Sequence, residues 1–317
     1  MAITAAMVKE LRESTGAGMM ECKKALSETD GNMEEAVEFL RKNGQAKAEK
    51  KANRIAAEGL TRIAVKDDQT AAVVEVNSET DFVAQNEKFQ AFVEAVAEQA
   101  VNSSAVDMDA FMAEKWVKNP EETVQEALVE ITSVISEKLS IRRFEKVTAE
   151  NGIVVPYLHG AGRIAVLVEA ATDVVNDDIK EALKNIAMQV AALAPKYVDM
   201  NDVSEEYRNH EKEILLAQAL NENEELPEDK RKPQQIIEKM LIGRLSKELK
   251  EICLNEQVYV KAEDGKQTVA QYVAQVAKQN HANLSITRFV RFETGEGIEK
   301  KNENFAEEVA KQAGMTK

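Results

Sequence analysis

The stretch TAAVVEVNSETDFVAQ, residues 70–85, contains the features that decide the fold. Its first half, 70–77, is a β-branched run that follows GLTRIAV across the polar turn 66–69, so the two runs predict a β-hairpin. Downstream, apolar side chains recur at helical spacing: Phe89, Phe92, Val93, Val96 and Ala100. Residues 78–85 therefore form a strand-to-helix loop, a kind of segment that often carries binding residues.

This loop places an acidic residue, Asp81, beside a large aromatic one, Phe82. Two interpretations are open from these residues alone. In the first, the hydroxyls of Ser78 and Thr80 cap the following helix, Asp81 stabilises its first turn, and Phe82 is tucked under it. In the second, the acidic and aromatic side chains contact a partner.

The middle of the chain repeats itself. The run AVVE at 72–75 matches AVLVE at 165–169. Each run is followed by a Thr-Asp pair and a helical pattern: Thr80-Asp81 in the first copy, and Thr172-Asp173 with the helix 179–193 in the second. We therefore predict an α+β fold with a duplicated core, each half being a small antiparallel sheet with helices on one face.

Offsets within the repeat locate an insertion. SIRRF at 140–144 matches SITRF at 285–289, an offset of 145, whereas Glu75 and Glu169 are offset by 94, so the second half is 51 residues longer. Two apolar stripes predict an antiparallel helical hairpin at about 200–250. The stripes are Val203, Tyr207, His210, Ile214 and Ala217, then Ile237, Leu241, Leu245, Leu249 and Ile252. A homodimer through this hairpin is a hypothesis that sedimentation equilibrium, with and without 203–244, would test.

The N-terminal part predicts a small three-helix module. Its helical patterns are separated by glycine-containing breaks: 4–13, 19–27 and 33–42. Met19 and Met20 lie near the first inter-helix turn, where flexible thioethers suit either gap filling or an adaptable contact surface. The basic run 41–54 is predicted to be an exposed linker. At the other end of the chain, 298–312 predicts an amphipathic helix.

Composition narrows the class of protein. The chain has 56 acidic and 41 basic residues and a formal charge of −15, which argues against direct nucleic-acid binding. Two distant cysteines, Cys22 and Cys253, offer no disulfide framework and favour a reducing compartment. No stretch has the length and apolarity of a signal peptide core or a membrane span. We expect a cytoplasmic protein.

Motifs of common catalytic and cofactor sites are missing from the sequence. There is no GxxxxGK[ST], GxSxG or HExxH, and His159, His210 and His281 have no neighbours at ligand spacing. We expect no cofactor, no bound metal and no covalent chemistry. His159 ends a strand run before Gly-Ala-Gly. Both a surface contact and structural support remain open as roles for this residue.

Two rival functions also fit parts of the sequence. One is a non-catalytic adaptor acting through 1–54. The other is a metal-dependent hydrolase built on four carboxylates: Glu75, Asp81, Glu169 and Asp173.

Five separated motifs resemble the elongation factor Ts family, in order over nearly the whole chain. They are TGAGMMECKKAL (15–26), SETDFVAQN (78–86), HGAGRIAVLVE (159–169), IAMQVAAL (186–193) and RFETGEGIEK (291–300). The resemblance implies a guanine-nucleotide exchange factor that binds elongation factor Tu with GDP, displaces Mg²⁺ and promotes GDP release so that GTP can bind.

The same resemblance implies a domain organisation. It comprises a ubiquitin-associated-like (UBA-like) domain and basic linker at 1–54, core halves at 55–148 and 149–292, and a C-terminal helical module at 293–317. The hairpin inserted at about 200–250 is expected to be a coiled coil. The segment 221–233 departs from the family in length and is first acidic, then basic, with prolines.

Residue roles also follow from the resemblance. Displacement of the partner's Mg²⁺ is implied for Thr80, Asp81, Phe82 and Val83. Contact with the nucleotide-binding domain of elongation factor Tu is implied for Arg12, Met19, Met20 and Lys23, and for the C-terminal helix. His159 and its loop are implied to face another domain of that partner.

Overall fold

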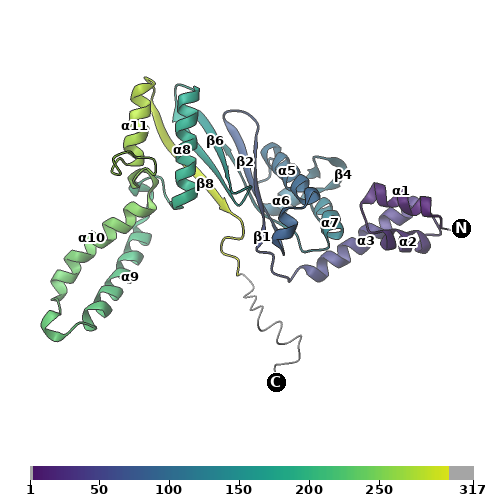
Figure 1. Ribbon diagram of the computed structural model, residues 1–317, viewed down its shortest axis with the longest axis horizontal. Coiled ribbons are helices and arrows are strands. Elements are labelled where there is room, and N and C mark those ends of the chain that lie inside the picture. Colours follow the sequence, from purple (N-terminus) through teal and green to yellow (C-terminus); the bar gives the residue numbers. More distant parts are fainter. Residues whose placement is uncertain (1–2, 300–317) are drawn as a thin grey trace.

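Three helices at the N-terminal end form a small module that stands to one side of the molecule (Figure 1). The computed structural model describes residues 3–299, apart from the side chain of residue 229. The module consists of α1 (Ala5–Thr15), α2 (Met19–Glu28) and α3 (Met33–Lys51). The Asn32 side chain accepts hydrogen bonds from the first amides of α3 and so caps that helix. The core is small: Val8, Leu11, Ala17, Cys22, Ala25, Leu26 and Ala36.

The basic run 41–54 is not the linker that the sequence predicted. It continues α3 as far as Lys51, and α3 packs on α7 (Val124–Ile135) of the core. Gly44 is buried at the crossing, where an added Cβ would lie 3.6 Å from the Cβ of Ser133. The prediction was wrong because Lys, Ala, Gln and Glu are good helix formers, and packing on a distant helix stabilises what the local pattern left undecided.

The first half of the core is an antiparallel sheet with helices over one face. Its strands lie in the order β1-β2-β5: β1 (Glu58–Val65), β2 (Thr70–Ser78) and β5 (Ser140–Thr148). The predicted hairpin of β1 and β2 is confirmed, with Glu58 opposite Ser78. The outer face packs on α5 (Glu87–Asn102), α6 (Met108–Ala113) and α7, and a two-stranded ribbon lies beside them: β3 (Lys115–Trp116) and β4 (Asn119–Thr123).

The second half repeats this plan. Its strands lie in the order β6-β7-β8: β6 (Gly152–His159), β7 (Ile164–Thr172) and β8 (Leu284–Glu293). The helices α8 (Asp177–Leu193) and α11 (Val269–Gln279) cover its outer face. The α+β class, with small antiparallel sheets and helices segregated to one face of each, is confirmed.

The two sheets pack face to face, an arrangement that no local pattern of the sequence predicted. Their inner faces share one apolar cluster: Ala71, Val73, Val147, Ala149, Val154, Ala165, Leu167, Val290 and Phe292. The order of layers is therefore helices, sheet, sheet, helices (Figure 1). The sandwich explains why β2 is buried at every position, because one face of it meets helices and the other meets the second sheet.

Buried glutamines reveal how closely the halves correspond. In the first half, the Gln99 amide on α5 donates to Glu114 and accepts from the Val117 N–H at 2.8 Å. In the second half, Gln189 on α8 donates to the Val258 carbonyl and accepts from the Val260 N–H at 2.8 Å. Each glutamine thus ties a later segment of its own half to its helix.

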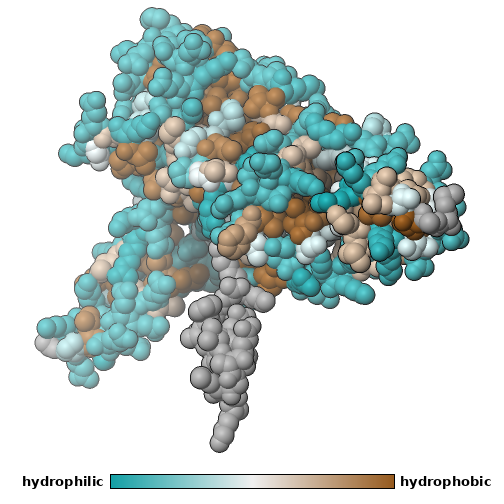
Figure 2. Space-filling view, turned by 45° about the vertical axis from the view of Figure 1, so that its right-hand side comes forward, coloured by the Kyte–Doolittle hydropathy of each residue, from teal (hydrophilic) through white to brown (hydrophobic). Residues whose placement is uncertain are grey.

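The surplus of the second half is the helical hairpin of α9 (Glu205–Glu224) and α10 (Gln234–Ile252). It projects from the body and is largely hydrophilic on the face in view (Figures 1 and 2). The predicted stripe holds on α10 at Ile237, Leu241 and Leu249. Ahead of and at the start of α9 it also holds, because Val203 and Tyr207 pack with Leu249. Farther along α9 it was wrong: Leu215 and Ala219 are the buried residues, whereas His210, Ile214 and Ala217 are exposed.

The connections complete the described chain. Short 3₁₀ helices lie before, within and after the hairpin: Met200–Asp202, Glu228–Lys230 and Leu254–Glu256. The expected C-terminal helix at 298–312 falls mostly outside the described residues. Among residues 3–299, no helix combines the length and apolarity that crossing a membrane requires.

Candidate functional site

The loop after β2 is held at its base by contacts to a segment far along the chain. The Glu79 carboxylate accepts a hydrogen bond from the Lys138 N–H at 2.5 Å and faces the Arg54 guanidinium at 3.3 Å. The Thr80 N–H and hydroxyl both donate to the Glu137 carboxylate, at 3.0 and 2.7 Å. Sequence reasoning missed Glu137, because no local pattern links it to a loop 57 positions away.

The tip of the loop is the four-residue helix α4 (Asp81–Ala84). Val83 is buried against the outer helical core, whereas the side chain of Phe82 is 79% exposed. The interpretation in which Phe82 is tucked under the helix is therefore wrong. An exposed phenylalanine flanked by two fixed neighbours, Thr80 and Val83, is suited to insertion into a partner.

The capping roles predicted for the loop hydroxyls are also wrong. The Ser78 hydroxyl donates to the Thr80 carbonyl at 2.9 Å, and the Thr80 hydroxyl bonds Glu137, so neither caps a helix. The Asn86 side chain caps α5 instead, accepting from the Lys88 and Phe89 amides. Asp81 is exposed, and it lies in the first turn of α4 rather than in that of α5.

Comparison of the two halves identifies the tip as an insertion. The Asp173 carboxylate accepts from the Asn283 N–H at 2.8 Å, just as Glu79 accepts from Lys138. Asn176 caps α8 as Asn86 caps α5. Seven positions separate Glu79 from Asn86, but only three separate Asp173 from Asn176.

The first half therefore carries four extra residues at this turn. This finding corrects the predicted correspondence, in which Thr80-Asp81 matched Thr172-Asp173; Asp173 corresponds to Glu79. The correspondence was misjudged because both turns contain Thr-Asp. The hydrogen bonds that show which residues are equivalent come from a segment distant in the sequence. The second half accordingly has no counterpart of α4 among its described residues.

His159 lies at the same end of the sheet sandwich as α4. Its loop is tied to β1, because the Gly162 carbonyl accepts from the Thr61 N–H at 2.7 Å. Arg163 pairs with Glu58 at 3.5 Å, and Glu58 is opposite Ser78 in the sheet. The ring is exposed, and its Nδ1 shares a hydrogen bond of 2.9 Å with the Tyr157 hydroxyl.

The four other predicted contact residues lie apart from these, on the N-terminal module. Met19 and Met20 are 59% and 73% exposed at the start of α2. Arg12 and Lys23 are exposed on α1 and α2. The reading of the two methionines as gap fillers is therefore wrong, and the module presents them to solvent.

A buried carboxylate, Glu75, joins the two halves near this end of the sandwich. It is fully buried in β2 and accepts from Arg143 Nε at 2.6 Å, Arg142 Nη1 at 3.0 Å and the Gly295 N–H at 2.8 Å. Burial by itself would raise the pKa of Glu75, but the bonds from Gly295, Asn77 and Arg143 outweigh it and hold the pKa below its usual value.

Replacing this carboxylate by an amide tests the junction. Glu75→Gln should lower the free energy of unfolding at pH 7 by about 1–3 kcal/mol, because the two guanidinium groups lose a charged acceptor. The folded-state pKa lies below the usual 4.5, so the contribution of Glu75 is complete above pH 4.5 and is lost as the pH falls through the folded-state value. Urea unfolding of the variant and the wild type, at pH 7 and again at a pH below the folded-state pKa, measures this contribution. A difference between variant and wild type that does not shrink in acid would contradict this assignment.

The four carboxylates of the hydrolase hypothesis do not form a metal site. Glu75 is saturated by donors in β2, and Glu169 lies in β7 of the other sheet. Asp173 is bonded to Asn283, and Asp81 is exposed on a separate turn. Within residues 3–299 no three His, Cys, Asp or Glu side chains are grouped so as to hold a metal ion. The hypothesis therefore has no structural support.

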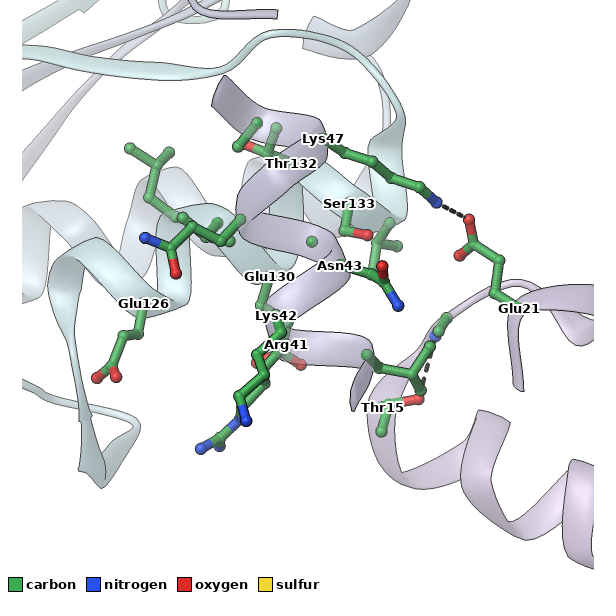
Figure 3. A pocket seen from close by; sticks show the side chains of 18 of the residues that line it. Thr15, Glu21, Arg41, Lys42, Asn43, Lys47, Glu126, Glu130, Thr132 and Ser133 are labelled. Atoms are coloured by element: carbon green, nitrogen blue, oxygen red, sulfur yellow. Dashed lines mark hydrogen bonds and ion pairs between the residues drawn. The ribbon is translucent and has the colours of Figure 1, made fainter. Parts of the chain in front are cut away.

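A groove of about 920 Å³ separates the N-terminal module from the core (Figure 3). Its walls are α3 and α7 together with parts of α1, α2 and β4, and Lys47 on α3 pairs with Glu21 on α2 at its edge. Polar and charged side chains such as Arg41 and Glu130 point into it (Figure 3). The groove lies where α3 crosses α7 and contains none of the predicted site residues, so we interpret it as the gap between two packed units.

Comparison with known proteins agrees with the motifs. The family model described as Elongation factor TS matches residues 79–296. The chain belongs to the elongation factor Ts family. The match begins at the base of the loop that carries α4, just after β2, and ends beside Gly295, so it covers the rest of the first half and all of the second half with its inserted hairpin.

Curated relatives extend the similarity over almost the full length. Elongation factor Ts of Clostridioides difficile (strain 630) is 53% identical over 311 residues, covering 98% of each chain. The protein of the same name from Clostridium novyi (strain NT) is 50% identical over 311 residues, again covering 98% of each. That from Clostridium tetani (strain Massachusetts / E88) is 49% identical over 311 residues, covering 98% of this chain and 99% of the relative.

Proposed function

We propose that the chain is the guanine-nucleotide exchange factor for elongation factor Tu. It binds the GDP form, displaces Mg²⁺ and promotes GDP release so that GTP can bind. The observation that carries this proposal is the exposed Phe82 ring on a turn that is anchored on both sides, in a member of this family. The factor acts through binding alone and carries out no covalent chemistry.

The partner's nucleotide site suggests how such a turn acts. GTPases hold the diphosphate through backbone amides and a bound Mg²⁺, so disturbing either contact releases the nucleotide. Phe82 inserts near the ion as an apolar wedge. Asp81, its exposed neighbour, then disturbs the hydrogen-bonded network around the ion. The factor need not touch the guanine base.

Energetics require a wide interface besides the wedge. Binding is reciprocal, so the loss of GDP affinity equals the factor's own loss of affinity when GDP binds. Shifting such an equilibrium decisively takes about 5.5 kcal/mol. Burying one phenylalanine supplies about 1.5–3 kcal/mol. The exposed residues of the N-terminal module, Met19 and Met20 with Arg12 and Lys23, and the His159 loop supply the remainder by contacting other parts of the partner.

Stopped-flow fluorescence tests the function directly. Purified elongation factor Tu is loaded with a fluorescent GDP, and release is followed after mixing with excess unlabelled nucleotide, with and without the chain. We expect release to accelerate with chain concentration and then to saturate. Binding without acceleration would favour the adaptor function instead and would overturn this proposal.

Asp81→Ala tests the link to the ion. Losing one hydrogen-bonding carboxylate should slow exchange by about two- to tenfold, because a net hydrogen bond contributes about 0.5–1.5 kcal/mol. The defect should be largest at moderate Mg²⁺ concentration and should vanish when the ion is chelated, since the partner then has no ion to lose. Stopped-flow release across a Mg²⁺ titration measures this. A defect of equal size at every Mg²⁺ concentration would exclude an ion-linked role for Asp81.

A further inference from the structure

The four-residue insertion comes with a side chain that the second half lacks. Glu137 follows the end of α7, and its place in the repeat is taken by Ala282, because Lys138 and Asn283 occupy equivalent positions. Ala282 has no carboxylate to offer. The first half thus has both an extra turn and an extra acceptor, and the two are in direct contact.

The contact uses both oxygens of the carboxylate. Glu137 Oε2 accepts from the Thr80 N–H at 3.0 Å, and Oε1 accepts from the Thr80 hydroxyl at 2.7 Å. Hydrogen bonds to an ionised acceptor are about twice as strong as those between neutral groups. Glu137 is itself fixed, because the next residue, Lys138, donates its N–H to Glu79 and Leu139 is buried in the core.

A turn as short as α4 needs such anchors. Four residues are far fewer than a stable isolated helix requires, and Thr80 gives α4 no side-chain cap. Two contacts fix the turn: Thr80 on Glu137 before it, and Val83 in the core within it. Phe82 lies between these two points, so they set the direction in which its exposed ring projects.

We propose that Glu137 is a positioning residue for nucleotide exchange, a role that rests on the proposed function of Phe82. It holds the base of α4 so that the Phe82 ring reaches the partner already oriented. A ring that is already oriented before binding loses less entropy in the step that follows, so the barrier of that step is lower. Loss of Glu137 therefore affects the exchange step more than the formation of the complex.

Kinetics with three variants test this role. Glu137→Ala should lower the maximal rate of GDP release about tenfold, with the half-saturating concentration changed less than about twofold. Glu137→Gln keeps one acceptor, so its maximal rate should lie between that of Glu137→Ala and that of the wild type. Thr80→Val removes the hydroxyl alone, and its effect should largely disappear in the Glu137→Ala background, because both changes break the same contact.

Asp173→Ala is the matched control. It removes a carboxylate that accepts two hydrogen bonds from Asn283 in the equivalent turn, which carries no insertion. Its maximal rate should equal that of the wild type. A rate as low as that of Glu137→Ala would mean that any loosened turn slows exchange, and the specific role of Glu137 would be overturned.

Hydrogen exchange on the free chain separates the positioning role of Glu137 from the role of Phe82 on which it rests. The Thr80 amide should exchange about tenfold faster in Glu137→Ala than in the wild type, and the Asn283 amide should be unchanged. If the amide loosens and Phe82→Ala slows release while Glu137→Ala does not, the positioning role is wrong and the function stands. If Phe82→Ala also leaves release unchanged, the wedge role of Phe82, on which this proposal rests, fails. An unchanged Thr80 amide would overturn the anchor directly.

Discussion

Phe82→Ala should lower the maximal rate of GDP release from elongation factor Tu by about 10- to 100-fold. Burying a phenylalanine side chain contributes about 1.5–3 kcal/mol, and each 1.36 kcal/mol corresponds to a factor of ten in rate. The ring is 79% exposed in the free chain, so its removal costs the fold almost nothing. We expect the free energy of unfolding to change by less than about 0.5 kcal/mol.

Saturating concentrations of the factor make this measurement decisive. Stopped-flow release is recorded until the rate no longer rises with factor, so that weaker binding cannot imitate a slower step. Val106→Ala serves as the control, because Val106 is an apolar residue 92% exposed in the loop before α6 and away from α4. Wild-type maximal rates for Phe82→Ala would contradict insertion of the ring.

Local periodicity predicted the parts of the fold that depend on near neighbours. The β-branched run 70–77 became β2, and the spacing of Phe89, Phe92 and Val96 became the buried face of α5. These signals are reliable because the side chains of one strand or helix face are fixed by its geometry. The duplication was readable for the same reason, since each half repeats the same local patterns.

Contacts between distant segments account for what the sequence did not predict. The packing of one sheet on the other depends on Val73, Leu167 and Phe292, which belong to three strands of two sheets. The short apolar run 71–74 in β2 was compatible with burial on both faces, but it did not identify the second layer. The α9 stripe failed similarly, because the buried face is set by how α9 meets α10, and Leu215 rather than Ile214 lies toward that partner.

The residues of the candidate site also fall into those that the sequence predicted and those that only the structure identified. Phe82 and Asp81 stood out because an aromatic beside a carboxylate in a loop is informative without any structure. Glu137 did not stand out, since a single glutamate after a helix is ordinary in a chain with 56 acidic residues. Its importance is visible only when Thr80 is placed 2.7 Å away and Ala282 is recognised as its counterpart.

The internal repeat suggests a sharper change than any point substitution. Residues 80–85 can be replaced by Val-Val, the pair that joins Asp173 to Asn176 in the second half. The new turn keeps Glu79 for Lys138 and Asn86 as the cap of α5, which are the anchors that suffice in the second half. We expect the chimera to fold, with a loss of about 1–3 kcal/mol from the missing burial of Val83.

Exchange, in contrast, should be abolished in this chimera, with GDP release at the spontaneous rate at any factor concentration. The N-terminal module and the His159 loop are untouched, so the chimera should still bind elongation factor Tu and compete with the wild-type factor. Stopped-flow release and competition measure the two properties separately, and Val174→Ala/Val175→Ala in the second half is the control. Acceleration of release by a folded chimera would locate exchange outside α4. Loss of both binding and exchange would mean that the turn supplies affinity rather than the step that expels the nucleotide, because the rest of the interface is unchanged.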